Sequence, residues 1–161
     1  MSQQTAVKYA YYPGCSLEAT AREYDLSVRA VCEHLGIELA EIPDWNCCGA
    51  SSGHSTDLRL ACNLAGRNLA LAEGMGMDIA VACPACYIRL RNAQKEMEQD
   101  EKQRNELTRL TDLPYNARYG TRHLLDIIYN EIGLENLRTK VVKPLHGLKL
   151  AAYYGCYLVR P

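Results

Sequence analysis

Three short apolar runs in the first half of the sequence each lead into a cysteine. Residues 6–12 stop at Pro13-Gly14 and are followed by Cys15, and residues 37–42 stop at Pro43, ahead of Cys47 and Cys48. Residues 79–82 lead directly into Cys83. Short apolar or alternating runs that stop at proline or glycine are typical of β-strands. The pattern predicts three strands, each with cysteine just beyond its carboxyl end.

Helical periodicity fills the intervals between these runs. Apolar residues recur four and three positions apart from Leu17 to Leu35, and Gly36 follows where a helix C-cap belongs. A second helix is expected from Ser55 or Thr56 to about Glu73. The residues that define the first helix are Leu17, Ala21, Tyr24, Val28, Val31 and Leu35.

The rest of the chain continues the alternation of helices and strands. Pro84 fits the first turn of a helix that runs through the charged stretch 89–109. A further helix is expected over 121–131, ending near Gly133, and residues 149–154 are expected to form a fourth strand. The resulting order, β-α-β-α-β-α-α-β, predicts an α/β fold with a mainly parallel sheet flanked by helices.

Charge and hydropathy exclude several classes of function. Eighteen Lys and Arg are balanced by nineteen Asp and Glu, for a net charge of −1, which offers no basic surface for nucleic acid or an anionic membrane. No apolar run approaches the ~18 residues that span a bilayer, and the N-terminus shows no signal peptide. We therefore expect a cytoplasmic protein with no nucleic-acid partner and no direct insertion into a membrane.

Eight cysteines stand out against this background. Disulfides are rare in a reducing compartment, so metal binding or redox chemistry is the better expectation. The carboxyl ends of parallel strands share one edge of a sheet, which is where ligands bind. Five thiols are thereby aimed at one place, and these are Cys15, Cys47, Cys48, Cys83 and Cys86.

The number of thiols, and the helix that begins beside two of them, indicate which type of site the cysteines form. Structural zinc takes four ligands, whereas iron–sulfur clusters are held by cysteine sulfur, so five converging thiols favour an iron–sulfur site. A helix that begins at Pro84 would favour thiolates at Cys83 and Cys86. Two alternatives stay open: a zinc-stabilised interaction domain, and a dithiol oxidoreductase that uses Cys83 and Cys86.

A short internal repeat links the two ends of the chain. Residues 8–15 (KYAYYPGC) align with residues 149–156 (KLAAYYGC), and in both a tyrosine-rich run ends in Gly-Cys. The chain is therefore interpreted as a first domain, residues 1–148, followed by the start of a truncated second copy, residues 149–161.

The cysteine pattern resembles the cysteine-rich CCG domain, and its surroundings resemble the B subunit of heterodisulfide reductase. The resemblance is most specific at residues 11–17 (YYPGCSL), 44–56, which begin DWNCCGA, and 81–86 (VACPAC). It implies two CCG domains, each with a non-cubane [4Fe–4S] cluster, held here by Cys15, Cys47, Cys48, Cys83 and Cys86.

The same resemblance implies a reaction and partners. The family reduces the disulfide of coenzyme M and coenzyme B, or a related disulfide. The electrons come from the iron–sulfur C subunit and the flavin-containing A subunit of the complex. Some CCG domains instead hold zinc, and related ones serve succinate, glycolate or lactate oxidation, which keeps the metal and the substrate open.

Four further residues receive individual predictions. Cys32 and Cys62 lie among apolar helix positions and are expected to be buried packing residues. Cys156 would serve the second cluster, whose other ligands are absent from this sequence, and is expected to be unliganded. His54, six residues after Cys48, is a candidate proton donor to a departing thiolate, with a cap or surface role as the alternative.

Overall fold

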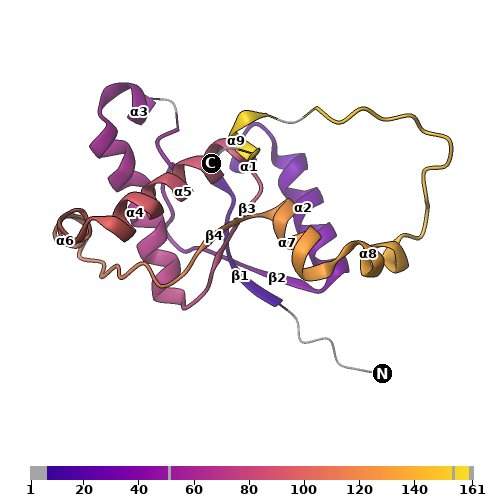
Figure 1. The fold of residues 1–161 in the computed structure, drawn as a ribbon, viewed down its shortest axis with the longest axis horizontal. Coiled ribbons are helices and arrows are strands. Elements are labelled where there is room, and N and C mark those ends of the chain that lie inside the picture. Colours follow the sequence, from indigo (N-terminus) through magenta and orange to yellow (C-terminus); the bar gives the residue numbers. More distant parts are fainter. Residues whose placement is uncertain (1–6, 51, 154, 160–161) are drawn as a thin grey trace.

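A four-stranded, all-parallel sheet forms the centre of the computed structural model, which describes residues 7–50, 52–153 and 155–159 (Figure 1). The strand order is β2-β1-β3-β4. The strands are β1 (Val7–Tyr12), β2 (Ile37–Glu41), β3 (Ile79–Val81) and β4 (Thr121–His123). The predicted α/β fold with a parallel sheet is confirmed.

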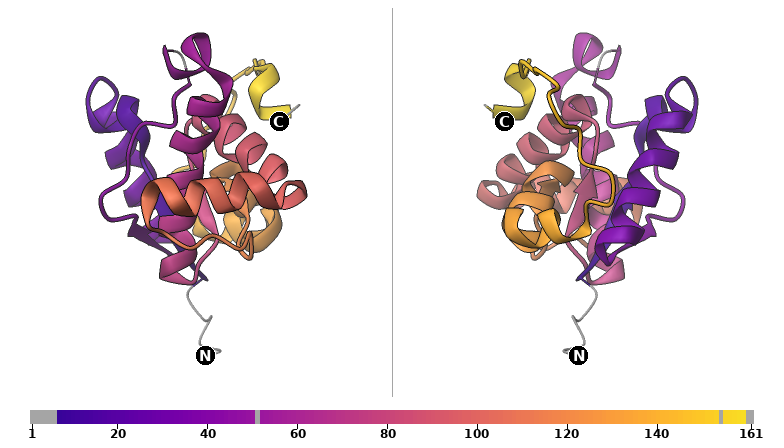
Figure 2. Two further views of the ribbon diagram at one scale, coloured as in Figure 1. Left: turned by 90° about the vertical axis from the view of Figure 1, so that its left-hand side faces the viewer. Right: turned by 90° about the vertical axis from the view of Figure 1, so that its right-hand side faces the viewer.

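Helices cover both faces of this sheet (Figures 1 and 2). One face packs against α4 (Leu58–Met75), α5 (Pro84–Gln99) and α6 (Glu101–Thr111). The other packs against α1 (Gly14–Glu18), α2 (Arg22–Leu35), α7 (Leu124–Ile127) and the π-helix η1 (Ile128–Ile132), beside α8 (Leu134–Lys140). Two short helices, α3 (Ser52–Thr56) and α9 (Cys156–Val159), complete the described part of the chain.

Strand β1 divides the core because its side chains alternate between the faces. Ala10 and Tyr12 belong to the apolar cluster beneath α4 and α5, whereas Tyr9 and Tyr11 belong to the cluster beneath α2. Tyr11 and Tyr12 are both fully buried. The tyrosine-rich sequence of β1 thus builds both halves of the core.

The first predicted helix is two helices in the structure. Ala19 and Ala21 have non-helical backbone angles, so α1 ends at Glu18 and α2 begins at Arg22. The break changes which side of α2 faces the core, because the apolar spacing that begins at Leu17 predicts one buried face only along a continuous helix. Tyr24 and Val31, predicted on the apolar face, are therefore 45% and 44% exposed.

Two further helix predictions are wrong at their boundaries. The helix expected through residues 84–109 is broken at Asp100, which ends α5 and caps α6 by accepting hydrogen bonds from the backbone N–H groups of Lys102 and Gln103. Helix α4 begins after Asp57, not at Ser55 or Thr56, because the Asp57 carboxylate accepts a hydrogen bond from the Leu60 N–H. Aspartate N-caps explain both boundaries.

The fourth strand lies elsewhere than predicted. Residues 121–123, expected to begin a helix, pair with β3, because buried Thr121 and His123 extend the sheet. Residues 149–153 form no strand, and Tyr154 lies outside the described residues. Leu150 is 81% exposed and Tyr153 is 100% exposed, because no strand of the described sheet lies beside these residues.

Candidate functional site

The carboxyl-terminal edge of the sheet gathers cysteines from three segments. Cys15 lies in α1 after β1, and Cys47 and Cys48 lie between β2 and α3, in residues 42–50, which we call the cysteine loop. Cys83 caps the N-terminus of α5, and Cys86 lies in its first turn. Because the strands are parallel and β1 separates β2 from β3, the three segments meet above β1.

Close sulfur–sulfur distances join these thiols into an outer pair and an inner group. The Sγ atoms of Cys15 and Cys47 are 3.9 Å apart, and both residues are exposed. The Sγ atoms of Cys48 and Cys86 are 3.5 Å apart, and both residues are buried. Cys83, half-buried, shares a hydrogen bond with Cys86. The site thus runs from a solvent-facing pair to a buried group.

The inner thiols differ in acidity because Cys86 lies between two others. A hydrogen bond with the Cys86 thiol lowers the pKa of Cys48 to about 7 and that of Cys83 to about 6. The N–H groups of Cys86 and Ala85, at the start of α5, lower the Cys83 pKa further. The pKa of Cys86 is raised far above its usual value by the same two hydrogen bonds. Of these three thiols, Cys86 therefore holds its proton most tightly.

Tyr12 closes the inner side of the site. Burial raises its pKa, and so does negative charge on nearby Cys48, whose sulfur shares a hydrogen bond with the Tyr12 hydroxyl. The hydroxyl donates a hydrogen bond to the Asn46 carbonyl at 2.8 Å. The Trp45 ring lies edge-on to the Tyr12 ring at 5.5 Å between centroids. Both rings thus pack with the buried cluster that contains Cys48 and Cys86.

Gly14 permits the close approach of α1 to Cys86. Its φ of +76° lies in the left-handed region, and a Cβ at this position would stand 2.9 Å from the Cys86 Sγ. In the sequence, Gly14 was interpreted only as the end of a strand. Its position directly before Cys15 was the available signal for a backbone that must pass close to sulfur.

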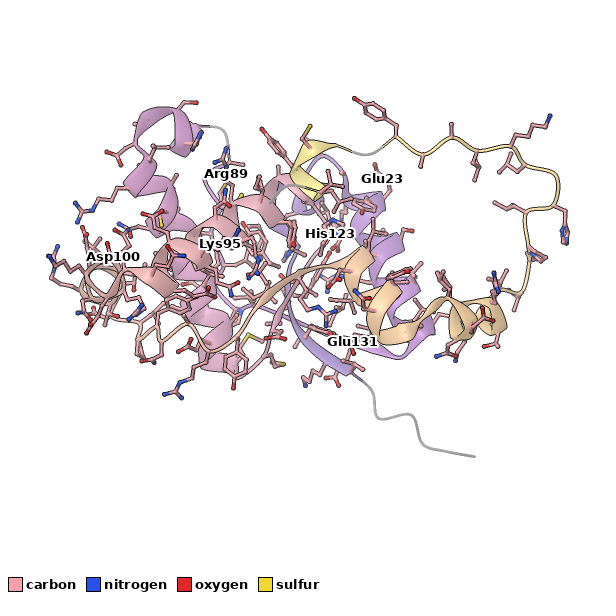
Figure 3. All side chains as sticks on the ribbon, viewed as in Figure 1. Glu23, Arg89, Lys95, Asp100, His123 and Glu131 are labelled. Carbon is pink, nitrogen blue, oxygen red and sulfur yellow. The ribbon has the colours of Figure 1, made fainter. Side chains whose placement is uncertain are left out.

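His54 lies on α3, where its backbone N–H donates a hydrogen bond to the Gly49 carbonyl at 3.0 Å. Its Nδ1 is 3.0 Å from Nη1 of Arg89, which projects from α5 and is labelled in Figure 3. Since a guanidinium only donates hydrogen bonds, His54 accepts at Nδ1 and carries its proton on Nε2. The two side chains border a cavity of about 200 Å³, whose other lining residues include Leu58, Cys62 and Glu96. In the sequence, Arg89 is one of many charged residues in the stretch 89–109, and it received no individual role.

The remaining cysteines lie away from this group. Cys32 and Cys62 are buried, as predicted, and burial raises the pKa of Cys32 to about 11 and that of Cys62 to about 12. Cys156 is exposed at the start of α9. Within residues 7–50, 52–153 and 155–159, no group of three or more His, Cys, Asp or Glu side chains is placed so that it could hold a metal ion.

The sequence also predicts that the chain does not insert directly into a membrane. Within the part of the chain that the structure describes, no helix is both long enough and apolar enough to cross a bilayer.

The fold and the sequence together define the class of protein. The family model of the CCG cysteine-rich domain matches residues 9–91, so the chain belongs to this family. This span contains all five cysteines of the sheet edge.

Relatives with established names extend the similarity to 96% of the chain. It is 36% identical over 155 residues to the 8-methylmenaquinol:fumarate reductase membrane anchor subunit of Wolinella succinogenes. It is 31% identical over 159 residues to a protein of Archaeoglobus profundus that is named as similar to the heterodisulfide reductase B subunit. It is 29% identical over 158 residues to the B subunit of the ferredoxin/F420H2-dependent CoB–CoM heterodisulfide reductase of Methanosarcina acetivorans. The chain covers 54%, 53% and 52% of these relatives, about half the length of each.

Proposed function

We propose that this chain is an iron–sulfur component of a reductase complex and transfers electrons at the five-cysteine edge of the sheet. The observation that carries the proposal is the sulfur-only donor set, in which Cys48 and Cys83 have pKa values of about 7 and 6. Thiolate is the form of cysteine that binds metal, and iron–sulfur clusters are held by such sulfurs. The residues present therefore fit an iron–sulfur cluster.

Cys15, Cys47, Cys48, Cys83 and Cys86 would hold a non-cubane [4Fe–4S] cluster. When bound, the cluster supplies one-electron transfer. The chain supplies the environment: Tyr12 and Trp45 exclude water from the inner side, and the start of α5 stabilises negative charge on Cys83. Cys86 must lose its proton to become a ligand, so binding of the group releases protons. The exposed Cys15 and Cys47 leave the outer side accessible to a substrate.

The proposed substrate is a disulfide of thiol coenzymes, of the coenzyme M and coenzyme B type. This choice is supported by the two relatives whose names refer to the B subunit of heterodisulfide reductase. Reduction of such a disulfide consumes two electrons and two protons and yields two thiols. His54 is proposed to donate one of the two protons. It would act as the imidazolium, which requires the Arg89 guanidinium to move away so that Nδ1 can take a proton, because loss of Nε2–H from a neutral imidazole would leave an imidazolate.

The proposed assembly is supported by the names of the same relatives, which refer to one subunit of a heterodisulfide reductase, and by the repeat. An iron–sulfur C subunit and a flavin-containing A subunit would deliver the electrons. Residues 1–148 would form the first of two CCG domains, and residues 149–161 would begin the second, because residues 149–156 repeat the sequence of residues 8–15.

A second candidate reaction is supported by the relative from Wolinella succinogenes, which has the highest identity of the three. In this alternative the same cysteines serve electron transfer in a quinol:fumarate reductase. Its membrane association would come through the assembled complex. The two candidates share the site and differ in the electron acceptor.

Metal analysis of the anaerobically purified chain tests the proposed cofactor. We expect iron and acid-labile sulfide with broad visible absorption, and we expect the absorption to be lost or altered by serine at any of the five cysteines. Cys32→Ser and Cys62→Ser are the matched controls, because both side chains lie outside the cysteine group and should leave iron content unchanged. Zinc without sulfide, or wild-type iron in Cys47→Ser, would refute the assignment.

The acceptor is tested on the complex purified from its host with a chemical electron donor. We expect reduction of a coenzyme M–coenzyme B disulfide, and His54→Ala should lower the rate while iron content is retained. Reduction of fumarate with no turnover of the disulfide would instead establish the second candidate.

A further inference from the structure

Asn68 is a polar side chain buried completely within the apolar face of α4. Its Oδ1 accepts a hydrogen bond from the backbone N–H of Asn46 at 3.0 Å, and its Nδ2 donates to the Asn46 carbonyl at 3.0 Å. Nδ2 also lies 3.2 Å from the Leu64 carbonyl within α4. The amide therefore pairs with both backbone groups of one loop residue, as a neighbouring β-strand would.

The other polar groups of Asn46 also have partners. Its Nδ2 donates to the carbonyls of Leu64 at 2.9 Å and Cys47 at 2.8 Å. Its Oδ1 accepts from Nη1 of Arg67 at 3.1 Å, and its carbonyl also accepts from the Tyr12 hydroxyl. Asn46 is thus held by α4 on one side and by β1 on the other.

The cysteine loop depends on these contacts because it contains no regular secondary structure. Strand β2 ends at Glu41 and α3 begins at Ser52. Backbone hydrogen bonds hold the two ends of the loop, from the Ile42 N–H to the Tyr11 carbonyl and from the His54 N–H to the Gly49 carbonyl, but among the described hydrogen bonds no strand ladder or helix holds residues 43–48. Asn46 directly precedes Cys47 and Cys48, whose sulfurs lie 3.9 Å and 3.5 Å from sulfurs on two other elements. Rotation of the peptide group at residue 46 would move both sulfurs.

We infer that Asn68 is a positioning residue that fixes the Cys47–Cys48 pair through the backbone of Asn46. It contacts no thiol itself among the described hydrogen bonds and acts through the loop. The inference deepens the proposed function, since it names the residue that orders two of the five ligands before any group binds.

The test substitutes Asn68→Leu, which removes all three hydrogen bonds at similar side-chain volume. In the reduced, metal-free chain we measure amide hydrogen exchange at residues 46–49 and the alkylation rate of Cys48 by iodoacetamide. Loss of two hydrogen bonds to one peptide group should raise both rates by about tenfold or more. Asn68→Ala is measured in the same way and serves if Asn68→Leu does not fold.

Two controls separate local from global effects. Asn63→Leu removes a hydrogen bond on the same helix, from Gln103 Nε2 at 3.1 Å, and should leave the loop rates unchanged. Cys32, buried on the other face of the sheet, should remain protected from alkylation in every variant.

Unchanged rates at residues 46–49 in the folded Asn68 variants would overturn the inference, and so would an equal rise at Cys32. Because the measurement uses the metal-free chain, its outcome is independent of whether the thiols bind iron–sulfur or zinc. Failure of this inference is therefore distinguishable from failure of the proposed function.

Discussion

Replacement of Gly14 by alanine should destabilise the chain through two separable effects. The first is conformational, because a φ of +76° costs a residue with a Cβ about 1–2 kcal/mol. The second is steric, since the new Cβ would stand 2.9 Å from the Cys86 Sγ and 3.3 Å from a Tyr12 ring carbon. Overpacking of a buried site typically costs about 1–3 kcal/mol. The expected loss in the free energy of unfolding is therefore about 2–5 kcal/mol.

Gly36 provides a matched control for the conformational part. Its φ is +78°, nearly the same as that of Gly14, and a Cβ there would meet nothing within 4 Å. Gly36→Ala should therefore cost only about 1–2 kcal/mol. The difference between the two variants measures the steric contact at the cysteine site.

The steric contact cannot be relieved cheaply. Cys86 is buried, and movement of its Sγ would lengthen the 3.5 Å contact with Cys48. Urea denaturation of the reduced chain, with all variants at one pH, gives the required free energies. Adding Cys86→Ala to Gly14→Ala should recover about 1–2 kcal/mol relative to additivity. Equal costs for Gly14→Ala and Gly36→Ala, or no coupling to Cys86, would refute the reasoning.

Three further outcomes are expected. Burial lowers the pKa of His123 below its usual 6.5, while Nε2 donates to the Ala82 carbonyl at 3.0 Å. The contribution of His123 to the free energy of unfolding should therefore be fully present above about pH 6.5 and decrease as the pH falls below it. Urea midpoints at pH 7.5 and 5.5 test this expectation. An equal pH dependence in the His123→Gln variant would contradict it. Mild oxidation of the metal-free chain by a small disulfide should yield Cys15–Cys47 and Cys48–Cys86 bridges, because their sulfurs are 3.9 Å and 3.5 Å apart. Peptide mapping by mass spectrometry identifies the bridges. Bridges to Cys32 would contradict the expected pairing. Tyr11→Phe removes the 2.6 Å hydrogen bond to buried Asp25 and should lower the free energy of unfolding by about 1–3 kcal/mol. The alkylation rate of Cys48, on the other face of the sheet, should stay unchanged. A faster reaction at Cys48 would contradict this and show that the two faces of the sheet are coupled.

The sheet edge was predictable because it depends on order along the chain. A strand that ends at a turn before a cysteine defines where that cysteine lies once the strands are parallel, and this holds for Cys15, Cys47 and Cys83. Burial of Cys32 and Cys62 followed from apolar neighbours on one helix.

The missing parts depend on contacts between distant residues. In the sequence, Asn68 is not distinguished from other polar residues of a helix. Only the fold brings its side chain to the backbone of Asn46. The pairing of Arg89 with His54 likewise needs α3 and α5 to be adjacent. Residues 121–123 became a strand because β3 offered a free edge, which outweighed the local helical pattern.

The fourth-strand prediction was wrong for a related reason. Residues 149–153 have a sequence similar to β1, but β1 is stabilised by strands on both sides and by helices on both faces. No comparable surroundings are formed by the described part of the chain near residues 149–153. Sequence similarity between repeats predicts a strand only where a partner strand is available.

The extended segment 141–153 has a consequence for the short helix that follows it. It passes well away from the helical layers before the chain returns to α9, which lies against α5 (Figure 1). A four-residue helix has little stability of its own, so α9 remains docked mainly because the tether keeps its effective concentration high. Lys149, which is followed by Leu150, is exposed on this tether, in reach of trypsin. A single cut there would turn an intramolecular contact into a bimolecular one, and Cys156 would leave with the released peptide.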